Sequence, residues 1–221
     1  MSETSSAIPP TPSAEDYAAE VDRPLIPEIK DPFALLEAWL VEARAHEPND
    51  ASAMSLATVD EQGLPDVRIV LLRGLSPQDG LKFYTNYKSV KARQLDASGQ
   101  AALCLHWKSL RRQVRVRGSV TRASAADSDA YFNRRTPQSR ISAIASDQSQ
   151  PLSSRQDFLE RVEAVQARYE ADGELTRPDN WGGYCLKPDV FEFWQDQAFR
   201  MHDRVRLTLN NGDWQSTRLY P

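Results

Sequence analysis

Residues 101–122, AALCLHWKSLRRQVRVRGSVTR, contain two strand-like runs separated by only a few residues, and they decide the fold class. In the second run, Val114 and Val116 alternate with Gln113 and Arg115. Alternation with a period of two is typical of a strand that buries one face. A connection this short cannot contain a helix, so we expect the two strands to pair antiparallel.

Further strand-like runs lie on both sides of this pair, at residues 53–59, 67–72, 81–85, 183–186, 190–195, 205–209 and 214–219. The last two runs flank Asn210-Asn211-Gly212-Asp213, which has the composition of a tight hairpin turn. The segment from Gly74 to Gly80 is rich in turn residues and is interpreted as a loop.

Helices are predicted before and after the first group of strands. Asp31 and Pro32 have the residue types of an N-cap and a first helical position, and Ser89 and Ser124 are further N-cap candidates. Two more helices are expected at residues 138–145 and 154–171. Since strands and helices seldom alternate, a doubly wound parallel sheet is disfavoured. The order favours an α+β fold, an antiparallel β-barrel with peripheral helices.

Composition narrows the possible functions of this chain. It has 221 residues and a formal net charge of -4, which argues against nonspecific binding to nucleic acid or to an anionic membrane. No apolar run approaches the roughly 18 residues of a membrane span, and the N-terminus does not resemble a secretory signal. Residues 1–30 are interpreted as a flexible arm, ordered in part by packing or ligand, and 31–221 as a single domain.

Cysteines and histidines indicate a cytoplasmic protein without a metal site. Cys104 and Cys185 lie in strand-like apolar runs and are expected to be buried free thiols in a reducing cytoplasm. The histidines show no paired spacing typical of metal ligands. The sequence also lacks GxGxxG and GxxxxGK[ST], so any nucleotide or flavin would be bound without these devices.

The segment Arg200-Met201-His202-Asp203-Arg204 concentrates cations around one carboxylate. Asp203 can neutralise only one guanidinium, which leaves a cation and the His202 imidazole for a planar, phosphorylated ligand. The alternative is an exposed charged turn after a strand.

Two further groups of residues are phosphate-binding candidates. The first comprises Arg68 and Arg73, which strand alternation predicts on opposite faces, and Lys91 with Ser89 at a helix start. The second spans a helix end and the turn after it, at Tyr131, Arg135 and Ser139. For each group the alternative is an ordinary structural role: residues flanking a core strand, a serine cap beside a surface lysine, or an exposed helix end.

The remaining polar candidates are amides and arginines. Gln113 can donate to and accept from the edge of a heterocycle, and Gln148-Ser149 repeats an amide beside a hydroxyl. Arg111, Arg112, Arg115 and Arg117 could suggest a nucleic-acid face, but the aromatic residues expected for base stacking are missing, with only Trp107 nearby. A solvated strand face or a subunit interface is the favoured interpretation of these arginines.

Taken in order, these motifs resemble the pyridoxine/pyridoxamine 5′-phosphate oxidase family of FMN enzymes. The resemblance covers residues 31–221 and rests on Asp-Pro-Phe, Arg-Ile-Val-Leu-Leu, Phe-Tyr-Thr-Asn, Arg-Gln-Val, Trp-Gly-Gly, Glu-Phe-Trp-Gln, His-Asp-Arg and the terminal Arg-Leu-x-Pro. It implies an FMN-binding split β-barrel and a homodimer with two flavins at its interface.

The resemblance also implies roles for individual residues. FMN would be held by Arg68, Ile69, Val70, Leu71, Leu72, Arg73, Tyr84, Thr85, Lys91, Gln148 and Ser149, and its ring would be surrounded by Gln113, Trp194 and Arg204. The substrate phosphate would be bound by Arg73, Tyr131, Arg135 and Ser139. Arg200 and His202 would lie over the substrate ring, facing the flavin, as the catalytic residues.

The implied reaction is oxidation of pyridoxamine or pyridoxine 5′-phosphate by O2 to pyridoxal 5′-phosphate, with release of H2O2. The chain departs from the family at Arg73, where a lysine is usual, at Val90, where an arginine is usual, and at Met201, where a leucine is usual. In the arm only Tyr17 remains of the usual pattern. Two alternatives stay open: a sister FMN oxidase acting on another ring, as in phenazine pathways, or a flavin- or pyridoxal-phosphate-binding protein without turnover.

Overall fold

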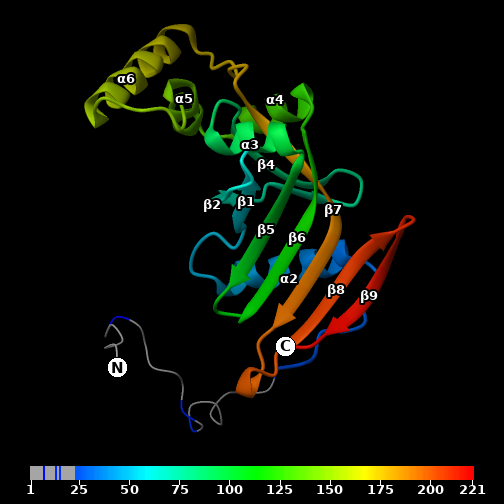
Figure 1. The fold of residues 1–221 in the computed structure, drawn as a ribbon. Helices are drawn as coiled ribbons and strands as arrows, with labels where there is room; N and C mark the ends of the chain where they lie inside the picture. Colours follow the sequence, from blue (N-terminus) through cyan, green and yellow to red (C-terminus); the bar gives the residue numbers. More distant parts are fainter. Residues whose placement is uncertain (1–6, 8–12, 14, 16–22) are drawn as a thin grey trace.

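The computed structural model describes residues 7, 13, 15 and 23–221, in which a large antiparallel sheet carries a group of helices at one end (Figure 1). Its strands are β1 (Ala53–Val59), β2 (Pro65–Leu71), β3 (Gly74–Ser76), β4 (Gly80–Asn86), β5 (Gln100–Trp107), β6 (Arg112–Arg122), β7 (Trp181–Gln195), β8 (Asp203–Asn210) and β9 (Asp213–Leu219). Its helices are α2 (Pro32–His46), α3 (Val90–Ser98), α4 (Ala125–Arg134), α5 (Pro137–Ala145), α6 (Arg155–Asp172) and the short 3-10 helix η1 (Ala198–Arg200). The predicted α+β class is confirmed.

Strand β7 is where the sheet splits. The strand order is β2-β1-β5-β6-β7-β4-β3, and β8 and β9 form a second branch from β7. The first half of β7 pairs with β4, from Trp181 to Leu186, and its second half pairs with β8, from Val190 to Gln195. One long strand therefore joins the helical end of the molecule to the end that carries η1 (Figure 1).

The structure corrects the prediction that residues 183–186 and 190–195 form two separate strands. Pro188 has no backbone N–H and suggested a break, but it lies within β7 at a register shift opposite Arg117 and Gly118. A β-bulge absorbs the proline without ending the strand. The loop predicted after Gly74 is also corrected, because β3 begins there and pairs with β4.

The core lies between the sheet and α2. Asp31 caps this helix as predicted, accepting hydrogen bonds from the backbone N–H groups of Phe33 and Ala34. Trp39 packs edge-on against Trp107 and Phe193, with ring centroids 6.4 and 5.3 Å away. These contacts belong to the main buried cluster, which the strands and α2 share.

Residues 23–30, which the sequence places in the arm, are packed against this core. Ile26 and Ile29 are only 3% and 5% exposed. The Ile26 N–H donates to Asp203 Oδ2 at 2.7 Å, and its carbonyl accepts from Arg218 Nη2 at 3.0 Å. Packing therefore orders the end of the predicted arm. Tyr17 and most of the arm lie outside the described residues.

The peripheral helices begin and end where the sequence predicts. The side chains of Ser89, Ser124 and Ser154 accept N-cap hydrogen bonds, and Gly173 ends α6 in the left-handed conformation. Cys104 and Cys185 are free thiols, although Cys104 is only half-buried. Among the described helices, none combines the length and apolarity needed to cross a membrane.

Candidate active site

A cavity of about 720 Å³ lies between the sheet and helices α3, α4 and α5. It brings together most of the predicted ligand-binding residues, namely Arg68, Ile69, Val70, Leu71, Arg73, Tyr84, Thr85, Lys91, Tyr131, Arg135, Ser139 and Gln148. The segments that supply them are distant in the sequence and meet because β4 pairs with β7, against which α4 packs.

Both arginines of the Arg68–Arg73 segment line this one cavity, which corrects the prediction that they point to opposite faces. Strand β2 ends at Leu71. The Leu72 N–H still donates to the carbonyl of Ser52, the residue before β1, but the Arg73 N–H donates to Lys82 O on β4 at 2.8 Å. Because the chain changes partner between these residues, strand alternation no longer sets the direction of Arg73.

One end of the cavity contains a lysine in contact with neutral acceptors. Lys91 Nζ donates to Gln148 Oε1 at 2.8 Å and to Thr85 Oγ1 at 3.3 Å. Burial, and then the nearby charge of Arg68, lower the pKa of Lys91. The Arg68 guanidinium is itself hydrogen-bonded to Leu56 O and Gln94, and it pairs with the half-exposed Asp66 carboxylate at 2.5 Å. A bound phosphate would relieve the repulsion between these two cations.

The other end holds a guanidinium that lacks a full set of partners. Arg135 Nη1 is buried and has no hydrogen-bond partner. Burial, with repulsion from Arg73, lowers the pKa of Arg135. The Arg135 guanidinium lies 4.9 Å from the centroid of the Trp181 ring. Two cations and an unpaired buried donor in one cavity are the arrangement expected at an anion site.

Aromatic rings form the wall beside Arg135. Tyr131 stacks on Tyr84 with centroids 3.9 Å apart, and Tyr131 and Trp181 are nearly parallel at 6.1 Å. The stack joins α4 to β4 and β7, so that Tyr131 is held at the cavity wall. Rigid rings at this position would limit the orientations of a bound phosphate ester.

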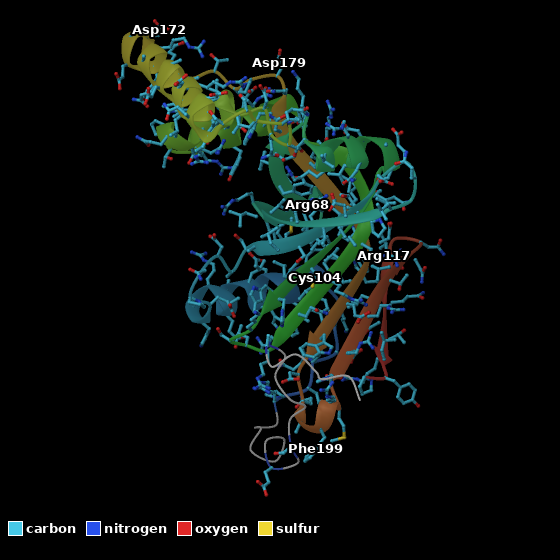
Figure 2. All side chains as sticks on the ribbon, turned by 60° about the vertical axis from the view of Figure 1, so that its left-hand side comes forward. Arg68, Cys104, Arg117, Asp172, Asp179 and Phe199 are labelled. Carbon is cyan, nitrogen blue, oxygen red and sulfur yellow. The ribbon has the colours of Figure 1, made fainter. Side chains whose placement is uncertain are left out.

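Five of the other predicted residues gather near η1, at the opposite end of the molecule: Gln113, Trp194, Arg200, His202 and Arg204. Arg68 lines the first cavity, and Figure 2 shows it far from Phe199 of η1, which lies at the other end of the molecule. The Trp194 and His202 rings are in contact, with centroids 4.7 Å apart. Gln113 pairs with Trp194 across β6 and β7. Within the described residues these side chains form a second cluster, separate from the first cavity.

Arg204, in the second cluster, is fixed by a buried carboxylate. Its Nε and Nη2 donate to Glu192 Oε1 at 3.1 and 2.7 Å, and its Nη1 donates to Tyr220 O at 3.0 Å. Glu192 Oε2 accepts from Arg115 and Arg206 at 2.6 and 3.3 Å. Burial favours a raised pKa for Glu192, but the hydrogen bonds from Arg204 and Arg115 outweigh it and lower this pKa.

Between the two clusters, the outer face of the sheet contains a cavity of about 420 Å³. Its lining includes Cys104, Arg115, Arg117, Val67 and Glu192. Cys104 and Arg117 lie between Arg68 and Phe199 in Figure 2. Arg115 and Arg117 thus lie on one surface between the two clusters, as expected for a strand face or a subunit interface. Arg111 and Arg112 do not line it, because they pair with Asp196 and Glu42.

Models of two protein families match the chain. The model described as pyridoxamine 5′-phosphate oxidase matches residues 40–169, more than half of the chain. The model described as the pyridoxine 5′-phosphate oxidase C-terminal dimerisation region matches residues 181–221. The chain belongs to the pyridoxine/pyridoxamine 5′-phosphate oxidase family.

Individual members of this family are similar over nearly the full length. The pyridoxine/pyridoxamine 5′-phosphate oxidase of Hyphomonas neptunium is 59% identical over 99% of this chain and 100% of its own length. The enzyme of the same name from Novosphingobium aromaticivorans is 51% identical, covering 86% of this chain and 94% of its own.

Two solved structures support the fold of this oxidase-family chain. PhzG from Burkholderia lata, in complex with tetrahydrophenazine-1-carboxylic acid, is 28% identical with a TM-score of 0.82, covering 87% of this chain and 94% of its own. An FMN binding protein from Nostoc punctiforme has a TM-score of 0.68 at 21% identity, covering 86% and 98% of the two chains, and shows the fold alone.

Several residues lie elsewhere than the family resemblance suggests, or were missed. Leu72 is buried in the core at 6% exposure, and Ser149 lies outside the first cavity's lining with a positive φ of 69°. Trp181 and Arg134 line the cavity but were not predicted to do so. The motifs contained signals for two missed residues, because Trp-Gly-Gly begins with Trp181 and Glu-Phe-Trp-Gln begins with Glu192.

Proposed function

We propose that this protein oxidises pyridoxine 5′-phosphate and pyridoxamine 5′-phosphate to pyridoxal 5′-phosphate, with FMN as cofactor and O2 as electron acceptor. The observation that carries the proposal is the buried, unpartnered Nη1 of Arg135 in a cavity shared with Arg73. A buried guanidinium donor without a partner is costly, and a phosphate group on the substrate would satisfy it.

The first cavity fits FMN because its residues supply both charge and polar contacts for a phosphate. Lys91, Thr85 and Gln148 are in mutual contact, and Arg68 adds positive charge beside them. They would hold the cofactor phosphate and its sugar-like chain. Ile69 and Val70 line the same cavity from β2 and would cover the apolar part of the cofactor.

FMN, when bound, would accept a hydride from C4′ of the substrate and pass two electrons to O2, giving H2O2. Oxidation of the alcohol needs no further reactant, whereas oxidation of the amine consumes one water and releases ammonia. The protein would contribute orientation and charge. Arg135 and Arg73 would bind the substrate phosphate, while Arg200 and His202 would align the ring and polarise its substituents.

We also infer that the active enzyme is a homodimer whose sites each combine both clusters. Trp194, Arg200, His202 and Arg204 all lie in the segment that matches the dimerisation region. The two clusters lie at opposite ends of one face, so a two-fold axis through that face would bring the first cluster of one protomer to the second cluster of its partner.

The exposed side chains of the face support this inference. Val67 and Ile69 on β2 are each 63% exposed. Val67 lines the cavity on the outer face, and Ile69 lines the first cavity. Exposed apolar residues beside a ligand site are typical of a surface that another chain covers. We expect the dimer to be cytoplasmic, in keeping with its two free thiols.

The decisive experiment is to purify the protein, record its flavin spectrum, and measure H2O2 with each phosphorylated vitamer and with unphosphorylated pyridoxamine. The proposal expects a bound flavin, peroxide from the phosphorylated substrates, and little from the unphosphorylated one. A flavoprotein that produces no peroxide from either phosphorylated vitamer would contradict it. Turnover of a phosphate-free tricyclic ring instead would favour the phenazine-type alternative. The observation behind that alternative is the structural similarity to PhzG.

A further inference from the structure

We propose that Asp196 is a positioning residue that holds the proton of His202 on Nδ1 and thereby presents Nε2 as a hydrogen-bond acceptor. Asp196 immediately follows β7, and no family motif used above includes it. The inference rests on the proposed function in one respect, that His202 faces the substrate.

The contact between the two side chains is direct. His202 Nδ1 lies 3.0 Å from Asp196 Oδ1, and the side chains are 22% and 12% exposed. The backbone between them doubles back through Phe199 and Arg200, which have positive φ angles of 54° and 59°. This left-handed turn brings residues close in sequence face to face.

A second group competes for the same ring nitrogen. The Gln197 N–H lies 3.3 Å from His202 Nδ1, and a hydrogen bond there would require an unprotonated Nδ1. We favour the proton on Nδ1 because the carboxylate is nearer and a charge-assisted bond is the stronger one. An unprotonated Nδ1 would instead place two acceptors 3.0 Å apart.

Asp196 is itself held in place on its other oxygen. Arg111 Nη1 donates to Asp196 Oδ2 at 2.7 Å, and Arg23 Nη1 lies 3.8 Å from the same oxygen. The Asp196 N–H donates to Arg111 O at 3.1 Å. Each carboxylate oxygen therefore has its own partner, and Oδ1 is directed at the imidazole.

The uncharged Trp194 ring packs against the His202 ring at 4.7 Å and restricts its rotation. With the tautomer and the ring plane both set, a neutral His202 carries its lone pair on Nε2. That atom can accept a proton or a hydrogen bond from a substrate hydroxyl or ammonium group. Asp196 would act only through His202.

Nuclear magnetic resonance tests the tautomer without any need for activity. The chain has only His46, His106 and His202, so ring-nitrogen spectra of protein labelled with 15N-histidine can be assigned with a His202→Gln variant. We expect a protonated Nδ1 and an unprotonated Nε2 for neutral His202, with this preference lost in Asp196→Asn. A neutral His202 protonated on Nε2 in the unsubstituted protein would overturn the proposal.

Kinetics test whether the contact matters to turnover. Asp196→Asn should lower kcat about 10- to 100-fold, the usual effect of losing a partner that orients a functional histidine. KM for pyridoxamine 5′-phosphate should change by less than about threefold, because the phosphate is bound by the other cluster. FMN affinity, measured by quenching of flavin fluorescence, should stay the same.

Arg111→Gln is the matched control, since it breaks the ion pair on Asp196 Oδ2 and leaves the contact with His202. It should retain most of the kcat. An equal loss of kcat in both variants would assign Asp196 a merely structural role and overturn the proposal. Absence of oxidase activity in the unsubstituted protein would instead contradict the proposed function, and the tautomer measurement would still decide the role of Asp196.

Discussion

At the residue scale, Arg135 is a cation in a place where burial opposes its charge. Replacing it by alanine removes a donor that the proposed substrate phosphate would satisfy. Charge-assisted hydrogen bonds contribute about 1.5–3 kcal/mol, so Arg135→Ala should raise KM for pyridoxamine 5′-phosphate about 10- to 100-fold. Steady-state peroxide assays would measure this effect.

The matched control for Arg135 is Arg168→Ala, which removes an exposed arginine on α6. Its KM should stay unchanged. Comparing substrates is the sharper criterion. The Arg135→Ala substitution should weaken the use of phosphorylated substrates only. If Arg135→Ala weakens the use of unphosphorylated pyridoxamine to the same degree, the guanidinium does not bind the phosphate.

Glu192 is the second residue whose environment leads to a prediction, in this case about the pH dependence of stability. Because its pKa is lower in the folded protein than in the unfolded chain, its charge stabilises the fold above the unfolded pKa, and this contribution is lost as the pH falls through the folded value. Glu192→Gln should lower Tm at pH 7 by at least about 2–4 °C, the shift expected for 1 kcal/mol in a chain of this size.

The difference in Tm between Glu192→Gln and the unsubstituted protein should shrink as the pH falls below about 4.3, the ordinary glutamate value. Thermal scans across that range would measure it. FMN binding should weaken as well, because Arg204 loses the partner that fixes it. A difference in Tm that grows on acidification would show that the sign of the Glu192 contribution is opposite.

At the scale of elements, local rules predicted most helices and strands. Caps at Asp31, Ser124 and Gly173 depend on neighbouring residues only, and the sequence displays those neighbours. The errors occur where partners are distant. The direction of Arg73 depends on pairing with Lys82, and the continuity of β7 through Pro188 depends on space provided by β6. Neither partner can be identified from a local pattern.

Gly118 on β6 provides the space that β7 needs at Pro188. Its replacement should therefore destabilise the pairing of β6 and β7. A Cβ atom on Gly118 would lie 1.9 Å from the Lys187 carbonyl oxygen, in the backbone of the bulge. Backbone atoms cannot move aside as a flexible side chain can, so Gly118→Ala should cost at least about 2 kcal/mol, several degrees of Tm. Ser119→Ala, at the next and exposed position, is the control and should be near neutral. A Gly118→Ala protein as stable as the control would mean that the bulge relaxes freely.

At the scale of the whole molecule, the family motifs specify ligand-binding residues that one protomer does not bring together. Arg135 lines the first cavity together with Arg68, whereas His202 lies beside η1. Figure 2 labels Arg68 and the η1 residue Phe199, which lie far apart. The residues of both clusters could be predicted from the sequence. The distance between the clusters could not, because it follows from the length of β7. The proposed dimer resolves this separation and makes a prediction that no arrangement within a single protomer shares.

With pyridoxamine 5′-phosphate held well below the raised KM of Arg135→Ala, the Arg135→Ala and His202→Ala homodimers should each show little activity, and mixing the two variants should restore it. In a mixed dimer, one site receives both defects and the other receives an intact first cluster and an intact second cluster. Random exchange gives mixed dimers half of the time, with one working site in two, so about a quarter of the unsubstituted activity should return. Native mass spectrometry would measure the mixed fraction. Recovery must track that fraction, and mixed dimers without activity would show that each site is built within one protomer.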